Sequence, residues 1–283
     1  MSVEEAISRD RILQIANSFP ATRHTLLQLG TLLRNPSVPL ERIVVPLRRD
    51  PALVARLIRS ANSVVYAQAE PVASVEDAVC LMGYQEVHRM VGFALLDHFS
   101  EGGLPSYAIT SQQLRENSLF TALLMEELAA GAGEDPRNCY TMGLLRSIGK
   151  VALDKIACDP RIEIGEVPER IEETGIAEWE RSVFGLTNTE AAAMIFTAWR
   201  FPNEFVVAVS DHYAPQGHLM PLTHLLHLAA GMAQLLGHGL PGESDYWDDS
   251  EESYRMAGLE PKGANLIIDH ALSSFDRLIM TVH

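Results

Sequence analysis

The sequence predicts an all-α protein of 283 residues. Three observations support this fold class. Apolar residues recur at helical spacing through most of the chain, and capping signatures precede many of the apolar runs. The alternating patterns typical of half-buried strands are almost absent. A hydrophobic fraction of 47% is enough for a real core in one large or two small globular units.

Capping signals mark several helices in the first hundred residues. Pro51 follows Asp50, which indicates an N-cap residue and a proline in the first helical turn. Ser74 with Asp77 indicates a second N-cap. We expect helices around residues 26–33, 40–47, 51–58 and 78–82.

The rest of the chain carries two capping boxes, one at Thr110 and one at Thr187, each with Gln or Glu three residues later. Asp135 and Pro136 indicate the start of one helix that carries Gly149 and Lys150. We expect helices at 111–128, from 136 past 150, and at 188–199, 202–209, 221–236 and 264–280, with a polar loop at 242–252.

A connecting loop is expected between residues 100 and 106, where Glu101-Gly102-Gly103-Leu104-Pro105 has turn composition. This loop would separate an N-terminal helical bundle over residues 1–100 from a larger helical lobe over residues 106–283. Each part is small for an independent core, so we expect the two to pack as one unit.

The net charge of −15 argues against general binding to nucleic acid or to anionic membranes, because both repel an acidic surface. The densest basic residues are Arg48, Arg49, Arg56 and Arg59. The N-terminal residues contain no apolar segment typical of a signal peptide, and no run approaches the length of a membrane span. We therefore expect a cytoplasmic protein.

The three cysteines, Cys80, Cys139 and Cys158, match no zinc or redox spacing. An odd number also argues against a disulfide framework. Because all three lie in apolar helical stretches, we expect them to be buried thiols.

Four motifs resemble those of one family. The run from Asp50 to Ser63 is similar to Asp-Pro-x-Leu-x-x-x-Leu-Leu-x-x-Ala-Asn-Ser, and 75–83 is similar to Ile-x-x-Ala-Ile-x-x-Leu-Gly. The run 143–150 has the frame Gly-Leu-Leu-x-x-Ile-Gly-Lys, and 184–190 begins with Phe-Gly. These motifs resemble the HDOD domain, a bacterial relative of the HD phosphohydrolases. The resemblance implies a multi-helix HDOD fold and a role in bacterial signalling, with links to cyclic-dinucleotide, chemotaxis or stress pathways.

The chain departs from the HD pattern where the related enzymes carry metal ligands. The departures are Asn117 for a first histidine, Arg146-Ser147 for His-Asp, Asn188 for the histidine after Phe-Gly, His212-Tyr213 for His-His, and Ala230 for an aspartate. A guanidinium cannot ligate a divalent cation, and such an ion needs three or more protein ligands. We therefore expect no metal, no cofactor and no catalytic residue.

The same positions supply the candidate binding residues. Arg146 and Lys150 could clamp an anion, together with Asn117, Asn188 and His212. Simpler interpretations are a helix-end cation for Lys150 and a hydrogen-bonded core histidine for His212.

Asn62, Ser63 and Trp247 are candidates for contacts with a partner. Trp247 lies in an acidic segment and could be an exposed anchor, since interfaces favour tryptophan. Asn62 and Ser63 could instead serve only to cap a helix and form a turn.

The leading prediction is a non-catalytic signalling module that binds a protein or a small ligand in the groove between its two parts. His224 and His227 share a helix face and could form a new metal site with His212 or His218. One alternative is a divergent metal-dependent phosphohydrolase that uses His212, His224 and His227 with a carboxylate such as Asp211. Another is a receptor for a nucleotide or small anion. The sequence does not identify the partner, the ligand, the pathway or the oligomeric state.

Overall fold

The computed structural model describes residues 9–19, 22–35, 37–66, 70–159, 175–215, 220–248, 250–260 and 264–282. These ranges contain helices and no β-strand; the pair Leu104 and Ile109 forms an isolated antiparallel bridge. The predicted all-α class is confirmed.

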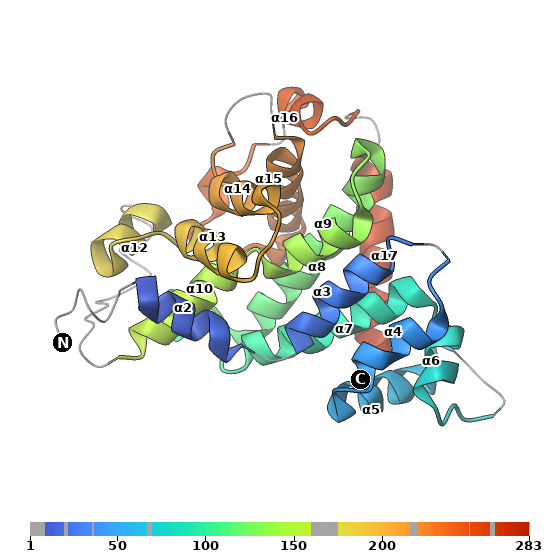
Figure 1. Ribbon diagram of the computed structural model, residues 1–283. Helices are drawn as coiled ribbons and strands as arrows, with labels where there is room; N and C mark the ends of the chain where they lie inside the picture. Colours follow the sequence, from blue (N-terminus) through green and yellow to red (C-terminus); the bar gives the residue numbers. More distant parts are fainter. Residues whose placement is uncertain are drawn as a thin grey trace.

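The helices before the predicted boundary lie along the lower and right-hand side of the molecule in Figure 1. They are α2 (Arg9–Ser18), α3 (Thr22–Leu32), α4 (Leu40–Leu47), α5 (Pro51–Ala61), α6 (Val75–Met82) and α7 (Tyr84–Ser100).

The later helices build the rest of the molecule. They are η1 (Pro105–Tyr107), α8 (Ser111–Ala132), α9 (Pro136–Leu145), α10 (Ile148–Ala157), α12 (Ile176–Phe184), α13 (Asn188–Ala198), α14 (Asn203–Asp211), α15 (Pro221–Ala233), η2 (Gln234–His238), η3 (Ser244–Tyr246), α16 (Glu251–Met256) and α17 (Ala264–Val282). The segment predicted as a polar loop at 242–252 therefore contains η3 and the first residues of α16.

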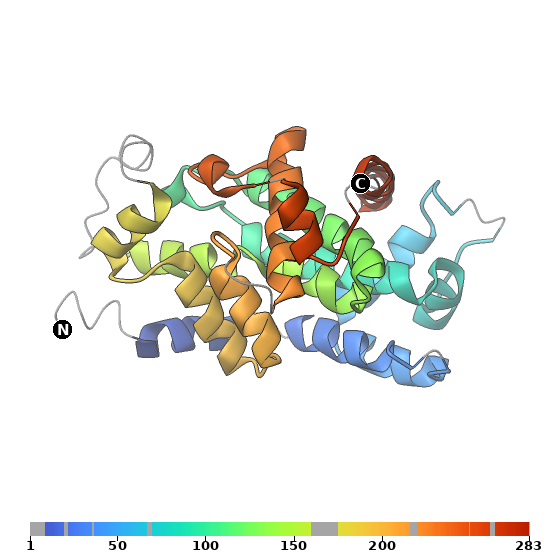
Figure 2. The same ribbon diagram turned by 90° about the horizontal axis from the view of Figure 1, so that it is seen from above.

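The long helix α8 is central, because α7, α9, α15 and α17 all pack against it (Figures 1 and 2). The two predicted parts also pack against each other through helices of each part. The first described helix, α2, packs on α10 and α13, whereas the last, α17, packs on α5. There the Ser60 hydroxyl donates to the Thr281 carbonyl at 3.3 Å.

The predicted helix starts are present as hydrogen bonds. Asp50 accepts from the Leu53 amide at 3.0 Å, with Pro51 as the first residue of α5. Both capping boxes are complete: Thr110 pairs with Gln113 at α8, and Thr187 pairs with Glu190 at α13. Such signals are local in sequence, so they can be read without knowledge of the tertiary fold.

The prediction of one helix from residue 136 past residue 150 is wrong. The chain bends at Arg146 and Ser147, so that α9 ends at Leu145 and α10 begins at Ile148. Close packing on both sides explains the bend. A Cβ at Gly143 would lie 2.7 Å from the Ala122 Cα of α8, and one at Gly149 would lie 1.8 Å from the Asn188 carbonyl oxygen of α13. Because of the bend, Gly143 packs against α8 and Gly149 packs against α13.

The prediction of three buried thiols is also wrong. Cys139 is buried, but Cys80 and Cys158 are exposed. Cys80 lies on the outward face of α6, and Cys158 is the C-cap residue of α10. An apolar helical stretch still has a solvent side, and short-range hydropathy does not identify which residues face it.

No helix in the described ranges is both long enough and apolar enough to span a membrane.

Candidate functional site

The five residues predicted to bind a ligand or anion meet in one buried cluster. Asn117 comes from the middle of α8, and Asn188 is the first residue of α13. Arg146 lies at the α9–α10 bend, Lys150 in the first turn of α10, and His212 just after α14. All five are buried, so the bend and the starts and ends of the helices direct polar groups into the interior.

Arg146 is held by three different elements. One Nη1 donor lies 2.9 Å from Glu243 Oε2, in the loop before η3. Nη2 donates to Asn117 Oδ1 at 2.7 Å, and Nη1 also lies 3.4 Å from His212 Nε2. His212 Nδ1 lies 2.9 Å from the Val209 carbonyl oxygen. A carbonyl only accepts, so Nδ1 carries the proton and Nε2 faces Arg146 as an acceptor.

Lys150 makes the second ion pair to the same carboxylate. Its Nζ lies 3.0 Å from Glu243 Oε1 and donates to the Tyr213 hydroxyl at 2.9 Å. The Tyr213 hydroxyl in turn donates to Glu243 Oε1 at 2.7 Å. Lys150 is 0% exposed, Arg146 is 2% exposed and Glu243 is 1% exposed. The carboxylate is therefore shared between two buried cations.

Glu180, on α12, is a second carboxylate of the cluster. It accepts from the Asn188 backbone amide at 2.7 Å, from Asn188 Nδ2 at 3.0 Å and from the Tyr107 hydroxyl at 2.8 Å. Burial raises the pKa of Glu180, while the charge of Lys150 and these hydrogen bonds act in the opposite direction. The two cations of the cluster thus lie near two carboxyl groups, of which Glu243 forms ion pairs with both.

The electrostatics of the cluster favour one protonation state near neutral pH. Burial alone would raise the pKa of Glu243, but Arg146, Lys150 and Tyr213 outweigh it and lower the pKa to about 2. Burial and the nearby Arg146 charge lower the pKa of His212 to about 3. An ionised Glu243 therefore faces a neutral His212.

Trp247 closes the cluster from the same segment that carries Glu243. Its ring lies 5.6 Å from the Arg146 guanidinium carbon and stacks on His212 with the centroids 6.1 Å apart. It also contacts His227 edge to face. Trp247 is half-buried rather than fully exposed, so much of its ring is engaged within the molecule.

The turn η2 links the cluster to the surface. Asn117 accepts from Arg146 and donates from Nδ2 to the His238 carbonyl at 2.7 Å. The His238 ring stacks on Phe120 and contacts Phe275 of α17. The chain from His238 to Glu243 is therefore anchored at both ends.

Asn62 and Ser63 lie elsewhere, at the end of α5, which stands well apart from α13 in Figures 1 and 2. The Asn62 side chain donates to the carbonyls of Ile58 and Val72 and accepts from the Val72 amide at 2.7 Å. These bonds fix the turn that follows α5.

Sequence reasoning missed Glu243, Glu180 and Tyr107, and treated Tyr213 only as the lost half of a histidine pair. Glu243 is one of several acidic residues between Gly242 and Glu252. The sole available signal was two cations without a nearby acidic partner in an apolar helix. That signal predicts a distant carboxylate but does not say which one.

The histidines considered for a new metal site do not form one in the described part of the chain. There, no group of three or more His, Cys, Asp or Glu side chains could hold an ion. Both ring nitrogens of His227 are used, because Nδ1 lies 2.8 Å from the His212 carbonyl and Nε2 accepts from the Asp248 amide at 2.9 Å. His218 lies outside the described residues.

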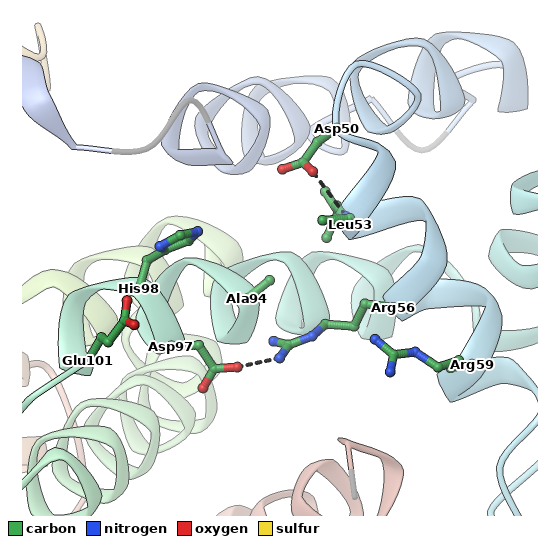
Figure 3. A pocket seen from close by; sticks show the side chains of 9 residues that line it. Asp50, Leu53, Arg56, Arg59, Ala94, Asp97, His98 and Glu101 are labelled. Atoms are coloured by element: carbon green, nitrogen blue, oxygen red, sulfur yellow. Dashed lines mark hydrogen bonds and ion pairs between the residues drawn. The ribbon is translucent and has the colours of Figure 1, made fainter.

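Two adjoining cavities open where α5 and α7 meet the later helices. The larger, of about 680 Å³, is bounded by α7, α8 and α17, and the smaller, of about 410 Å³, by α5 and α7. Both are lined by Arg56 and Asp97, which form an ion pair (Figure 3). We call these two cavities together the lobe cleft; the larger lies between the two predicted parts, and the smaller adjoins it and is lined by residues of 50–101.

This chain belongs to the HDOD domain family, whose profile matches residues 19–215. That match covers more than half of the chain, and it confirms the resemblance found in the motifs. A search of curated proteins finds no match.

Solved structures with the same fold share about a fifth of their residues with this chain. An HDOD domain protein of unknown function from Geobacter sulfurreducens is 20% identical, with 97% of this chain and 98% of that one covered and a TM-score of 0.69. A "Putative signal transduction protein" from Marinobacter aquaeolei VT8 is 20% identical (99% and 67% covered, TM-score 0.71). A "Putative phosphohydrolase" from Shewanella amazonensis SB2B is 19% identical (96% and 97% covered, TM-score 0.63). At this identity the likeness shows the fold alone.

Proposed function

We propose that this protein is a non-catalytic regulatory module of bacterial signalling. It acts by binding a protein segment or a small ligand in the lobe cleft. Membership of the HDOD family and the signalling name of one structural neighbour support the setting. Two features of the buried cluster support the absence of catalysis: its poor fit to a metal ion and the position of Glu243.

The buried cluster does not suit a divalent metal ion. At the position of the HD pair stands Arg146, a permanent cation whose Nη1 faces His212 Nε2 at 3.4 Å. Asn117 and Asn188 supply neutral amides, and both are already hydrogen-bonded within the cluster. A metal would need several free lone pairs in place of a guanidinium. We therefore derive no metal-assisted step.

Glu243 is the observation that carries the proposal. A carboxylate of the chain itself lies between Arg146 and Lys150, where an anionic ligand would have to bind. An external phosphate or carboxylate would have to displace Glu243 and lose its three partners. The same argument weighs against the alternative of an anion receptor at Arg146 and Lys150.

The phosphohydrolase alternative is tested by activity together with metal content. Purified protein is dialysed, its metals are measured by elemental mass spectrometry, and hydrolysis of p-nitrophenyl phosphate and bis(p-nitrophenyl) phosphate is followed with added Mn²⁺ or Mg²⁺. We expect far less than one metal per chain and no hydrolysis above a buffer control. Hydrolysis that is lost in an Arg146→Ala or His212→Ala variant would overturn the proposal.

A further inference from the structure

The larger cavity of the lobe cleft has an apolar wall. Phe93 of α7 and Leu119 of α8 face Phe275 and Ile279 of α17 across it. Phe93 and Leu119 are buried, whereas Phe275 and Ile279 are half-buried and remain accessible. A volume of about 680 Å³ falls within the roughly 300–1,000 Å³ typical of ligand sites. The cavity can therefore hold the apolar body of a small molecule.

The carboxylates of this cavity already have partners. Asp97 is paired with Arg56. Glu116 accepts from Gln112 Nε2 at 2.7 Å, and its other oxygen lies 3.4 Å from His238 Nδ1. Asp97 is thus paired with a permanent cation, whereas Glu116 faces a cation only when His238 is protonated.

The arginines, by contrast, retain unused donors. Within the described ranges, the Arg115 side chain has no hydrogen bond or ion pair, although it lines the cavity and is half-buried. The Arg56 guanidinium pairs with Asp97 and lies over the Phe93 ring, 5.5 Å from its centroid, and its Nη1 is buried without a hydrogen-bond partner. The accessible unpaired charge of this cavity is therefore the cation of Arg115, so the complementary group is an anion.

The smaller cavity adds the guanidinium of Arg59, which forms no ion pair with the part of the chain that the structure describes, but also an opposing charge. Figure 3 shows Arg56 and Arg59 extending from α5, with Asp97 meeting Arg56 while Arg59 meets none of the side chains drawn. Glu101 lines the same cavity. The larger cavity is lined by two arginines and two carboxylates, whereas the smaller is lined by two arginines and three carboxylates, so the larger is the better place for an anionic head group.

We propose that the larger cavity of the lobe cleft binds an amphipathic organic anion. One carboxylate or phosphate group would contact Arg115, and its apolar chain or ring would lie against Phe275 and Ile279. This inference rests on the proposed function, because it names the class of ligand that the lobe cleft takes.

The test uses 8-anilinonaphthalene-1-sulfonate, an amphipathic anion whose fluorescence reports binding. Full-length protein is titrated with this probe, and the folded state of every variant is checked by circular dichroism. We expect saturable binding that weakens at least tenfold in Arg115→Gln and in Ile279→Glu. Arg34→Gln, at a separate cavity between α3, α9 and residues 199–205, is the matched control and should leave the binding unchanged.

Competition then separates the two halves of the ligand. Decanoate and decyl phosphate should displace the probe, whereas 1-decanol and inorganic phosphate should each be at least tenfold weaker. Equal displacement by decanol would mean a merely apolar surface, and equal displacement by inorganic phosphate a plain anion site; either result overturns the inference. A probe that binds Arg115→Gln as tightly as the unmodified protein also overturns it. These failures leave the proposed absence of catalysis intact, whereas hydrolysis in the assay above overturns the proposed function whatever the lobe cleft binds.

Discussion

The buried cluster around Glu243 and the lobe cleft each contain an arginine paired with a carboxylate, but they expose these groups differently. Arg146 and Glu243 are 2% and 1% exposed, whereas the side chains of Arg56 and Asp97 are 24% and 30% exposed. In the cluster, Glu243 forms ion pairs with both cations. In the lobe cleft, Arg115 has no hydrogen bond or ion pair within the described ranges. The comparison teaches that the charges of the buried cluster are paired within the interior, while the accessible charges line the lobe cleft.

The largest effect is expected from Glu243→Ala. This change leaves Arg146 and Lys150 buried without their shared carboxylate, which should lower the free energy of unfolding by about 3–5 kcal/mol. Urea denaturation followed by circular dichroism measures it. Asp97→Ala, at the partly exposed pair, is the control and should cost about 1 kcal/mol or less. Similar losses at both sites would refute the contrast between them.

A somewhat smaller loss is expected from Gly149→Ala. The added methyl group would meet the Asn188 carbonyl oxygen, which belongs to the backbone of α13 and cannot rotate away. Overpacking of this kind typically costs about 1–3 kcal/mol. Gly30→Ala in α3 is the control, because its nearest neighbour is His88 Nε2 at an ordinary 3.5 Å. For Gly30→Ala we expect no loss in the free energy of unfolding. A Gly149→Ala variant as stable as Gly30→Ala would contradict the close approach of Gly149 to α13.

The pH dependence of the free energy of unfolding tests the buried cluster through the protonation of His212. Its pKa is about 3 in the folded state against an ordinary 6.5, so the unfolded chain binds more protons as the pH falls below about 6.5. Stability should therefore decrease on acidification, by up to about 1.4 kcal/mol per pH unit for one such histidine.

Other groups contribute to the same pH profile. Buried His88, with a pKa of about 4, also makes the protein less stable as the pH falls, and Glu243 does so below about pH 4.5. Denaturation between pH 7.5 and 5 in the unmodified protein and in His212→Gln isolates the His212 contribution. The variant should show the shallower dependence; identical slopes would mean that His212 is not held neutral.

The smallest effect on stability is expected from Arg115→Gln. Because this side chain has no partner within the described ranges, its replacement should change the free energy of unfolding by less than about 0.5 kcal/mol. The same urea experiment measures the change. A loss above about 1 kcal/mol would show that Arg115 supports the fold rather than remaining open in the lobe cleft.

The parts of the fold that could be predicted from sequence depend on neighbours in the chain. The Thr110–Gln113 and Thr187–Glu190 capping boxes are three residues apart, and both are present as predicted. The bend at Arg146 and Ser147 could not be predicted, because it depends on the approach of α8 and α13 to two glycines. The exposure of Cys80 could not be predicted either, because it also depends on how the helices pack in the tertiary structure.

That the candidate binding residues lie together could be predicted in part, because the family frame indicates which positions face the interior. Arg146, Lys150 and Asn188 meet in the structure as that frame suggested. The frame gave no indication of Glu243, since the residue lies in an acidic loop outside the matched motifs. Which of the loop's carboxylates enters the core is decided by the path of the chain after Gly237 and Gly242, both of which have positive φ.

The central claim is that Glu243 acts as a built-in anion between Arg146 and Lys150. Restoring an anion to Glu243→Ala tests it most directly, with the melting temperature measured in sodium acetate and in sodium chloride of equal ionic strength. A ligand that binds only the folded state raises its stability. We predict that acetate raises the melting temperature of the variant above its value in chloride and leaves the unmodified protein unchanged. Equal melting temperatures of the variant in the two salts, or an equal gain in the unmodified protein, would contradict the claim.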